Sequence, residues 1–192
     1  ETVSTPVHER RTARPMLRIV HSFLTLEQHL RAIVTTPRSY HPERCPHCGR
    51  ACLWAHGFYE RKADRSSGGA LNSVPVPRYC CAACGRTCSR LPLCICPLRW
   101  YGWALQQLVL ALIFFGVSLR RTAAVIGVDR HTVRRWWCWL VRCSNDFAFA
   151  LRSRFPDLGR TADTASFWHA CFALMPLSRA MAWLDLDGLD VP

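Results

Sequence analysis

The sequence predicts an α+β fold in which helices predominate. Residues 45–90 are punctuated by cysteine and glycine and contain short strand-like runs. From about residue 101 to 143 the spacing of apolar residues is helical, and a further helical segment follows over about 145–185. A chain of 192 residues is long enough for one compact domain or two small ones.

The chain is strongly basic, and its charge is unevenly distributed. The formal net charge is +12, and the basic residues are 24 arginines and one lysine, Lys62. Residues 144–192 hold four arginines and six aspartates, so the first 143 residues carry +14. A segment this basic favours a polyanion such as nucleic acid, or an anionic membrane surface. The alternative is a soluble protein from an arginine-rich proteome.

Twelve cysteines fit either a secreted disulfide scaffold or an intracellular metal protein. The sequence starts with a polar stretch that lacks the apolar run of a cleavable signal. The longest apolar run, residues 108–117, is well short of the about 20 residues that cross a bilayer. We therefore expect a cytoplasmic protein with metal-bound thiolates and no membrane partner.

Two copies of a C-x-x-C-G-R motif, "CPHCGR" and "CAACGR", predict a metal site. A two-residue gap lets both thiolates of one tight turn point at the same ion, and the glycine that follows can adopt a positive φ. Four thiolates suit one tetrahedral, structural Zn²⁺ with no position open for water. A redox-active C-x-x-C is the alternative. The predicted ligands are Cys45, Cys48, Cys81 and Cys84.

The segment between the motifs supports this prediction. Residues 52–61 and 73–80 have the composition of strands and are separated by a turn-rich stretch. Together with the two cysteine pairs they predict a zinc ribbon over residues 41–97. Cys80 and Cys88 are then surplus and are expected to be free thiols, although Cys80 stays open as an alternative ligand.

Residues 1–40 are expected to form a basic arm, up to about residue 16, and then a short helix. Thr25 and Gln28 have the spacing of a capping box in front of the apolar pattern of "LEQHLRAIV". Two prolines follow and end this helix.

Residues 98–143 contain the second strong pattern, "SLRRTAAVIGVDRHTVRRWWCWL" at 118–140. An apolar helix at about 103–115 precedes a helix that ends at Gly127, and Asp129 is a good N-cap for the next helix. A short helix, a glycine turn and a capped basic helix are typical of a helix-turn-helix, whose second helix enters the major groove of DNA.

The core face of this last helix is expected to hold Val133, Trp137 and Leu140. Trp136 and Trp139 exceed what one core face needs. We expect them to pack against the C-terminal helices, a second subunit or a protein partner.

The arginines of this segment are candidates for DNA contacts, because a guanidinium can bind guanine or phosphate with two hydrogen bonds. The alternative is a three-helix bundle with solvated arginines. The predicted DNA-binding residues are Arg120, Arg121, Arg130, His131, Thr132, Arg134 and Arg135.

Four stretches in this order resemble the N-terminal region of zinc-ribbon and helix-turn-helix transposase-like proteins of bacterial insertion sequences. They are "CPHCGR", "HGFYERKADR", "PRYCCAACGRTCSRLP" and "GVSLRRTAAVIGVDRHTVRRWW", and the resemblance covers about residues 40–140. It implies binding to element ends or similar duplex sites on the bacterial nucleoid. Where such proteins usually have an aromatic residue, this chain has Cys88.

The resemblance does not extend to catalysis. Such transposases use three carboxylates that hold two metal ions, and residues 144–192 are too few for that domain. The nearby Asp185, Asp187 and Asp190 are expected to form a solvated acidic tail. The sequence therefore predicts a non-catalytic DNA-binding protein, either a regulator or a targeting component of a mobile element. The alternatives are a truncated or partner-dependent recombinase subunit, and a protein-interaction module that uses the ribbon and the tryptophan-rich helices.

Overall fold

The computed structural model describes residues 18–63, 69–97, 101–159 and 161–191, and the basic arm expected over residues 1–16 lies outside them. Within these residues the protein is α+β, with six α-helices and two small sheets, as the sequence predicts. In chain order the elements are β1 (Ile19–Val20), α1 (Leu26–Thr35), η1 (Pro37–Tyr40), β2 (Leu53–Arg61), β3 (Val74–Cys81), β4 (Thr87–Cys88), β5 (Leu91–Pro92), α2 (Trp103–Phe114), α3 (Leu119–Ile126), α4 (Arg130–Arg154), η2 (Pro156–Leu158), α5 (Thr164–Leu174) and α6 (Leu177–Leu186).

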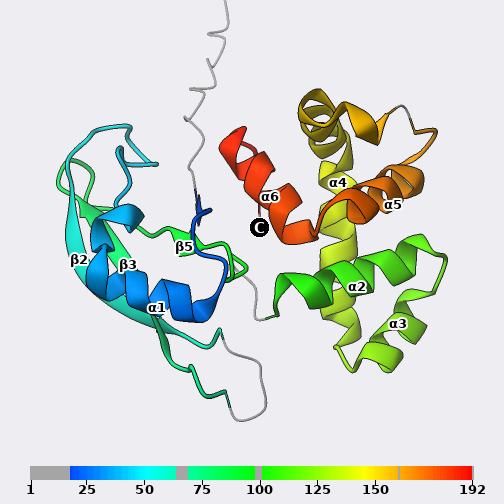
Figure 1. The fold of residues 1–192 in the computed structure, drawn as a ribbon, viewed down its shortest axis with the longest axis horizontal. Coiled ribbons are helices and arrows are strands. Elements are labelled where there is room, and N and C mark those ends of the chain that lie inside the picture. The colour runs from blue at the N-terminus through cyan, green and yellow to red at the C-terminus, as the bar shows by residue number, and fades with distance from the viewer. Residues whose placement is uncertain (1–17, 64–68, 98–100, 160, 192) are drawn as a thin grey trace, which may run out of the picture.

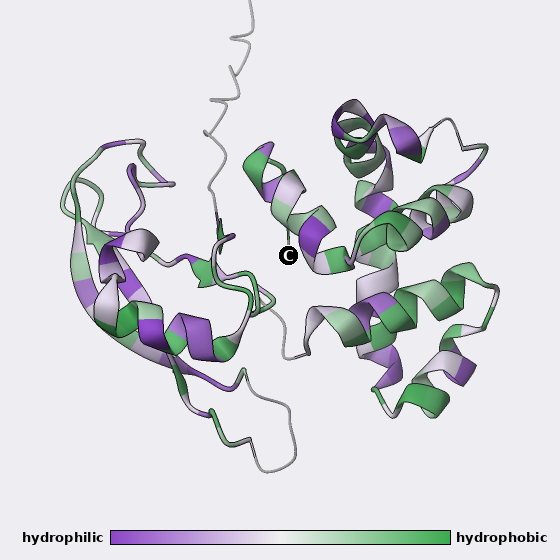
Figure 2. Cartoon of the chain, in the orientation of Figure 1, coloured by the Kyte–Doolittle hydropathy of each residue, from purple (hydrophilic) through white to green (hydrophobic). Residues whose placement is uncertain are grey.

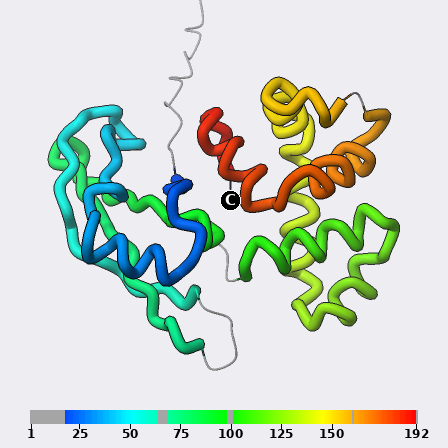
Figure 3. The backbone as a smooth tube through the Cα atoms, viewed as in Figure 1, coloured from blue at the N-terminus to red at the C-terminus, as the bar shows by residue number. Residues whose placement is uncertain are grey.

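The elements form two units, which we call the N-terminal unit (residues 18–97) and the helical unit (residues 101–191). In Figure 1, β2, β3 and α1 lie on one side of the molecule, α2 to α5 lie on the other, and α6 lies between them. Figure 3 shows the first described residues, in dark blue, beside the green segment that contains β5. Strand β1 pairs in parallel with β5, so the start and the end of the N-terminal unit meet.

The antiparallel hairpin of β2 and β3 is the main part of the three-stranded sheet, and β4 pairs with the other edge of β3. The strands predicted at 52–61 and 73–80 are confirmed to within one residue. Their ladder places Leu53 opposite Cys81. This register brings the start of β2, which follows the first cysteine pair, beside the second pair.

Helix α1 packs on the hairpin and belongs to the N-terminal unit. Its predicted capping box is confirmed, since the Thr25 hydroxyl accepts from the Gln28 backbone N–H and the Gln28 side chain accepts from the Thr25 N–H. The fully buried His29 lies with Nδ1 2.5 Å from the Tyr40 hydroxyl and Nε2 3.0 Å from the Pro75 carbonyl oxygen. Burial lowers the pKa of His29, so the imidazole is neutral and ties α1 to β3.

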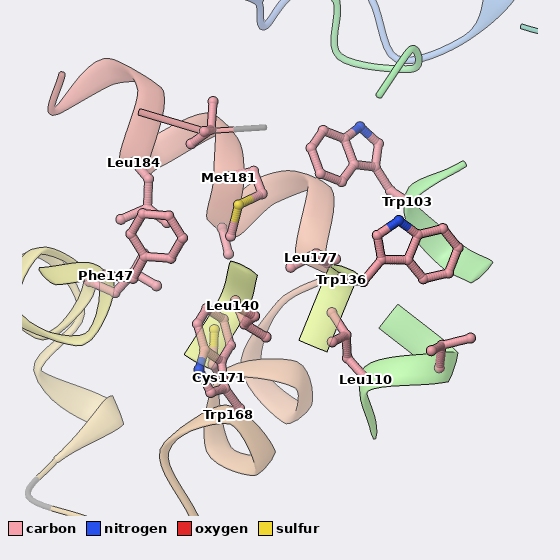
Figure 4. Close-up of a cluster of buried hydrophobic side chains, with 14 of the residues drawn as sticks. Trp103, Leu110, Trp136, Leu140, Phe147, Trp168, Cys171, Leu177, Met181 and Leu184 are labelled. Carbon is pink, nitrogen blue, oxygen red and sulfur yellow. The ribbon is translucent and has the colours of Figure 1, made fainter. Parts of the chain in front are cut away.

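One large apolar cluster forms the core of the helical unit, and Figure 4 shows its centre. Side chains from α2, α4, α5 and α6 converge there, including Leu110, Trp136, Trp168 and Met181. Ile19 of β1 and Cys96 also belong to this cluster, so the core continues into the N-terminal unit.

The tryptophans of α4 pack against other residues of the chain, but the extent to which each is buried differs from the prediction. Trp136, expected to be surplus, is the most buried of them at 1 % exposure, and its ring meets Tyr101 edge-on. Trp137, expected in the core, is only partly buried and packs against Phe114. Trp136 lies within the large apolar cluster to which α2 and α6 also contribute, whereas Trp137 lies at the edge of this cluster.

Helix α4 runs without a break through the predicted domain boundary at residue 143. Ser144 is buried within it, where its hydroxyl donates to the Leu140 carbonyl and accepts from the Trp168 indole N–H. This polar residue is therefore satisfied inside the helix and does not end it. The expected C-terminal helical segment consists of the last turns of α4 followed by η2, α5 and α6.

Hydrophobic residues extend along most of α2, as Figure 2 shows. This helix has 12 residues, and its apolar side chains pack against α3, α5 and α6. Among the described helices, none combines the length and the hydropathy needed to span a bilayer.

The two units are joined by the carboxylate of Asp185 on α6, which is fully buried. It accepts the backbone N–H of Arg18 at 2.9 and 3.0 Å and that of Ile19 at 3.0 Å. Burial raises the pKa of Asp185, whereas these N–H groups and the charges of Arg90 and Arg18 lower it. The expectation of a solvated acidic tail is therefore wrong for Asp185, because the unit packed against α6 removes this carboxylate from water.

We predict that Asp185→Ala destabilises the fold by about 1–3 kcal/mol for each buried N–H that it leaves unpaired. Asp190→Ala is the matched control, since Asp190 also pairs with Arg18 but its side chain is 81 % exposed, and it should change stability by less than about 1 kcal/mol. Urea unfolding followed by circular dichroism measures both. Equal losses for the two variants would contradict the role assigned to Asp185.

Candidate functional site

The two C-x-x-C-G-R motifs form matching tight turns. In the first, the Cys45 N–H donates to the Arg50 carbonyl at 2.9 Å and the Gly49 N–H donates to the Cys45 carbonyl at 2.8 Å. In the second, the Cys81 N–H donates to the Arg86 carbonyl at 3.0 Å and the Gly85 N–H donates to the Cys81 carbonyl at 2.9 Å. Both glycines have positive φ, 74° and 69°, a region where a side chain is strained. The sequence repeat is thus a structural repeat.

The register of the hairpin brings the two turns together. The four predicted sulfur atoms all lie within 4.8 Å of one another. The Sγ atoms of Cys45 and Cys84 are 3.7 Å apart, and those of Cys48 and Cys81 are 3.5 Å apart. Four cysteines at these distances can hold one metal ion.

The ionisation of this cluster depends on the thiols as a group. Burial raises the pKa of the Cys81 thiol, but the backbone N–H groups of Cys84 and Ala83 lower it. The pKa of Cys48 is raised to about 11, since burial and the three neighbouring thiols outweigh the N–H of Arg50. The backbone N–H groups of the second turn thus favour a thiolate at Cys81, whereas burial and neighbouring thiols raise the pKa of Cys48 and Cys84.

A fifth thiol, that of Cys52, lies beside the cluster, and this position was not predicted from the sequence. Its Sγ lies 3.5 Å from that of Cys81, and its carbonyl accepts the Ala82 N–H at 3.0 Å. Cys52 lies directly before β2, and its place at the start of the strand predicted at 52–61 was the available signal. Cys80 lies outside the cluster, with Sγ 3.8 Å from the Gly85 carbonyl oxygen, and Cys88 is buried.

A second candidate site lies at the turn between α3 and α4. Gly127 ends α3 in the left-handed conformation, with φ 72°, and Val128 is buried at 5 % exposure. The Asp129 side chain accepts the backbone N–H groups of His131 and Thr132 at 2.9 and 3.1 Å. The predicted glycine turn and N-cap are both present, and they fix the direction in which α4 leaves α3.

Six of the seven predicted DNA-binding residues have exposed side chains. Thr132 is the exception, because it is partly buried and its hydroxyl accepts from the Arg135 guanidinium at 3.0 Å. On α3, Ala123 is buried but Ala124 is exposed, so only one of the two alanines packs. The exposed residues are Arg120 and Arg121 on α3 and Arg130, His131, Arg134 and Arg135 on α4.

We predict that the protein binds one metal ion per chain and that Cys84→Ser abolishes this binding, because three thiolates remain. Cys80→Ser and Cys52→Ser should keep a ratio of one, since neither sulfur belongs to the four that lie within 4.8 Å of one another. Elemental analysis of the purified variants measures the ratio. Loss of metal in Cys80→Ser with retention in Cys84→Ser would show that the ligand set is wrong.

Residues 45–136 match a protein family described as a domain of unknown function (DUF6431). The matched segment includes all four clustered cysteines and all seven predicted DNA-binding residues, which end at Arg135. Searches of curated proteins and of solved structures found no match to this chain. This chain is therefore similar to that domain over the part that holds both candidate sites.

Proposed function

We propose that this protein is a zinc-stabilised, non-catalytic DNA-binding protein that recognises duplex DNA through a helix-turn-helix formed by α3 and α4. It acts as a regulator or as the targeting component of a mobile element. The observation that carries the proposal is the set of exposed cationic side chains on the first two turns of α4, where the helix is fixed by the turn to α3.

The chemistry of the four cysteines supports zinc as the metal. A tetrahedral Zn²⁺ with bonds of about 2.3 Å to sulfur requires sulfur atoms about 3.8 Å apart. The separations of 3.5 and 3.7 Å between sulfur atoms are close to this value. Cys45 and Cys81 are buried and the four sulfurs complete the coordination, so the ion has a structural role in the hairpin.

The charge of the α3–α4 surface supports a nucleic-acid partner. Residues 118–142 hold six arginines and one acidic residue, Asp129, whose carboxylate caps α4. The N-terminal end of α4 adds the positive end of its helix dipole to this surface. Arg130, His131 and Arg134 suit base edges in a major groove, whereas Arg120 and Arg121 on α3 suit the phosphate backbone.

The contacts of the C-terminal aspartates support a role without catalysis. Asp185 accepts backbone N–H groups, Asp187 pairs with Arg154, and Asp190 pairs with Arg18 at 2.7 Å. Asp185 and Asp190 both contact Arg18, whereas Asp187 is held by Arg154 on α4, so each carboxylate is engaged by donors of the chain itself. Metal-dependent strand transfer requires carboxylates that converge on shared metal ions. Among the described residues, the group placed to hold a metal ion is the four cysteines, and it includes no aspartate.

We predict that Arg134→Ala weakens binding to the preferred sequence by about 1–3 kcal/mol, the cost of one lost base contact. Arg179→Ala on α6 is a matched control, because Arg179 is also exposed but lies outside the α3–α4 surface. Selection from a random duplex pool identifies the sequence, and fluorescence anisotropy measures the affinity. Absence of binding to any duplex at low salt would contradict the proposal.

Binding should also weaken steeply with salt, because each phosphate contact releases counterions. The logarithm of the binding constant should fall with the logarithm of salt concentration by about 0.9 for each phosphate neutralised. Arg121→Ala should reduce this slope by about one unit and leave the sequence preference unchanged. A slope near zero would exclude duplex DNA as the partner and favour a protein-interaction module.

Removal of the metal should unfold the hairpin, because four adjacent thiols then lose the ion that holds the two turns together. We predict a lower melting temperature with a chelator and recovery on addition of Zn²⁺, measured by circular dichroism. Zinc affinity should fall as the pH is lowered, since protons compete for the thiolates. An unchanged melting temperature in metal-free protein would contradict the structural role.

A further inference from the structure

A stripe of exposed, mostly apolar residues follows the basic turns along the same face of α4. Cys138, Val141, Asn145 and Phe149 are spaced by three, four and four residues, and this face points away from the core. Phe149 is 77 % exposed and Val141 is 44 % exposed. Isolated exposed apolar residues are ordinary, but a stripe with this spacing is the pattern of a helix that packs against another helix.

Two hollows flank Phe149 at the surface, with volumes of about 540 and 640 Å³. Asn145 and Ala148 line the first, and Asp146 and Leu189 line the second. The ring therefore stands above its surroundings on the exposed face of α4. The spacing of the stripe is symmetric about Asn145, with Val141 and Phe149 four residues to either side, and a two-fold interface requires this kind of self-complementarity.

The charges beside the stripe select the arrangement of the two copies. Arg142 and Asp146 are exposed on the same flank of α4, and neither forms an ion pair among the described residues. When two α4 helices pack antiparallel about a two-fold axis at Asn145, Phe149 of each copy meets Val141 of the other. Arg142 of each copy then lies on the same side as Asp146 of the other. In a parallel pair these two residues would lie on opposite flanks.

This arrangement leaves the basic turns of α4 available. The helical overlap covers residues 136–154, about 28 Å at 1.5 Å per residue, and residues 130–135 extend beyond the end of the partner helix. The other two arginines near the stripe are already engaged, since Arg152 donates to Thr161 and Arg154 pairs with Asp187. Arg142 and Asp146 are thus the charges available for a second copy.

We propose that the protein forms a homodimer through the C-terminal half of α4, packed antiparallel about Asn145, with Phe149 as the apolar anchor and Arg142–Asp146 as the reciprocal ion pair. The interface is separate from the residues assigned to DNA and does not depend on that assignment.

A charge swap tests the ion pair. Sedimentation velocity should find a dimer for the zinc-loaded wild-type chain. Arg142→Glu and Asp146→Arg should each raise the dissociation constant at least about tenfold, because like charges then meet across the interface. The double variant, Arg142→Glu with Asp146→Arg, should return to within about threefold of the wild type, since the pair is restored with reversed polarity.

Circular dichroism checks that each variant is folded, which the exposure of both side chains favours. A wild-type chain that is monomeric at all concentrations would overturn the proposal. A double variant that dimerises no better than the single variants would overturn it as well, because the charges would then not face each other.

A cross-link tests the orientation. In the antiparallel pair Asn145 meets its own copy at the axis, so Asn145→Cys should yield a disulfide-linked dimer on oxidation. The native Cys138 then lies about 21 Å from its copy, too far for a disulfide. Arg179→Cys on α6 is the control and should give no linked dimer. Dimers linked through Cys138 in the wild type would overturn the antiparallel arrangement.

Discussion

The placement of the two units depends on one buried carboxylate. A charged group without water is costly unless hydrogen bonds and opposite charges surround it, and Asp185 has both. It accepts from the backbone of Arg18 and Ile19, while Arg90 donates to the Ile19 carbonyl at 3.2 Å and places its positive charge nearby. The bond from the Trp103 indole N–H to the Leu93 carbonyl and the contacts of the Arg18 guanidinium with Asp190 and the Val191 carbonyl are further links between the units. Together these contacts determine where the cysteine cluster lies relative to α4.

The two units differ in what stabilises them. The helical unit has one large apolar cluster to which most of its helices contribute, whereas the buried apolar side chains of the N-terminal unit fall mainly into two small clusters. Small cores bury too little surface to balance the loss of chain entropy, and such units commonly rely on a metal or a disulfide. The four-cysteine cluster, which could hold a metal ion, lies at the end of the hairpin. The structural metal that we propose would thus act where the apolar core is smallest.

Helix α4 is long enough to carry both proposed surfaces, the one for DNA and the one for a second copy. Its 25 residues extend over about 37 Å, more than one contact region needs. The buried face is continuous from Val133 to Leu151 and anchors the whole helix in the core. The exposed face is basic over the first two turns, and further along it carries Val141 and Phe149 beside the charged Arg142 and Asp146. The proposed DNA surface and the proposed dimer surface therefore lie on the same helix.

The sequence by itself determined the features that arise from neighbouring residues. The capping box at Thr25, the N-cap at Asp129, the two strands and the matching cysteine turns depend on local backbone geometry, and all were predicted at the right positions. Only the tertiary structure decided which side chains lose contact with water. In the folded protein Asp185 is buried, and Trp136 rather than Trp137 lies deepest in the core. The thiol of Cys52 lies beside that of Cys81, and α4 continues through Ser144. Each of these outcomes depends on partners far away in the chain, which no local pattern specifies.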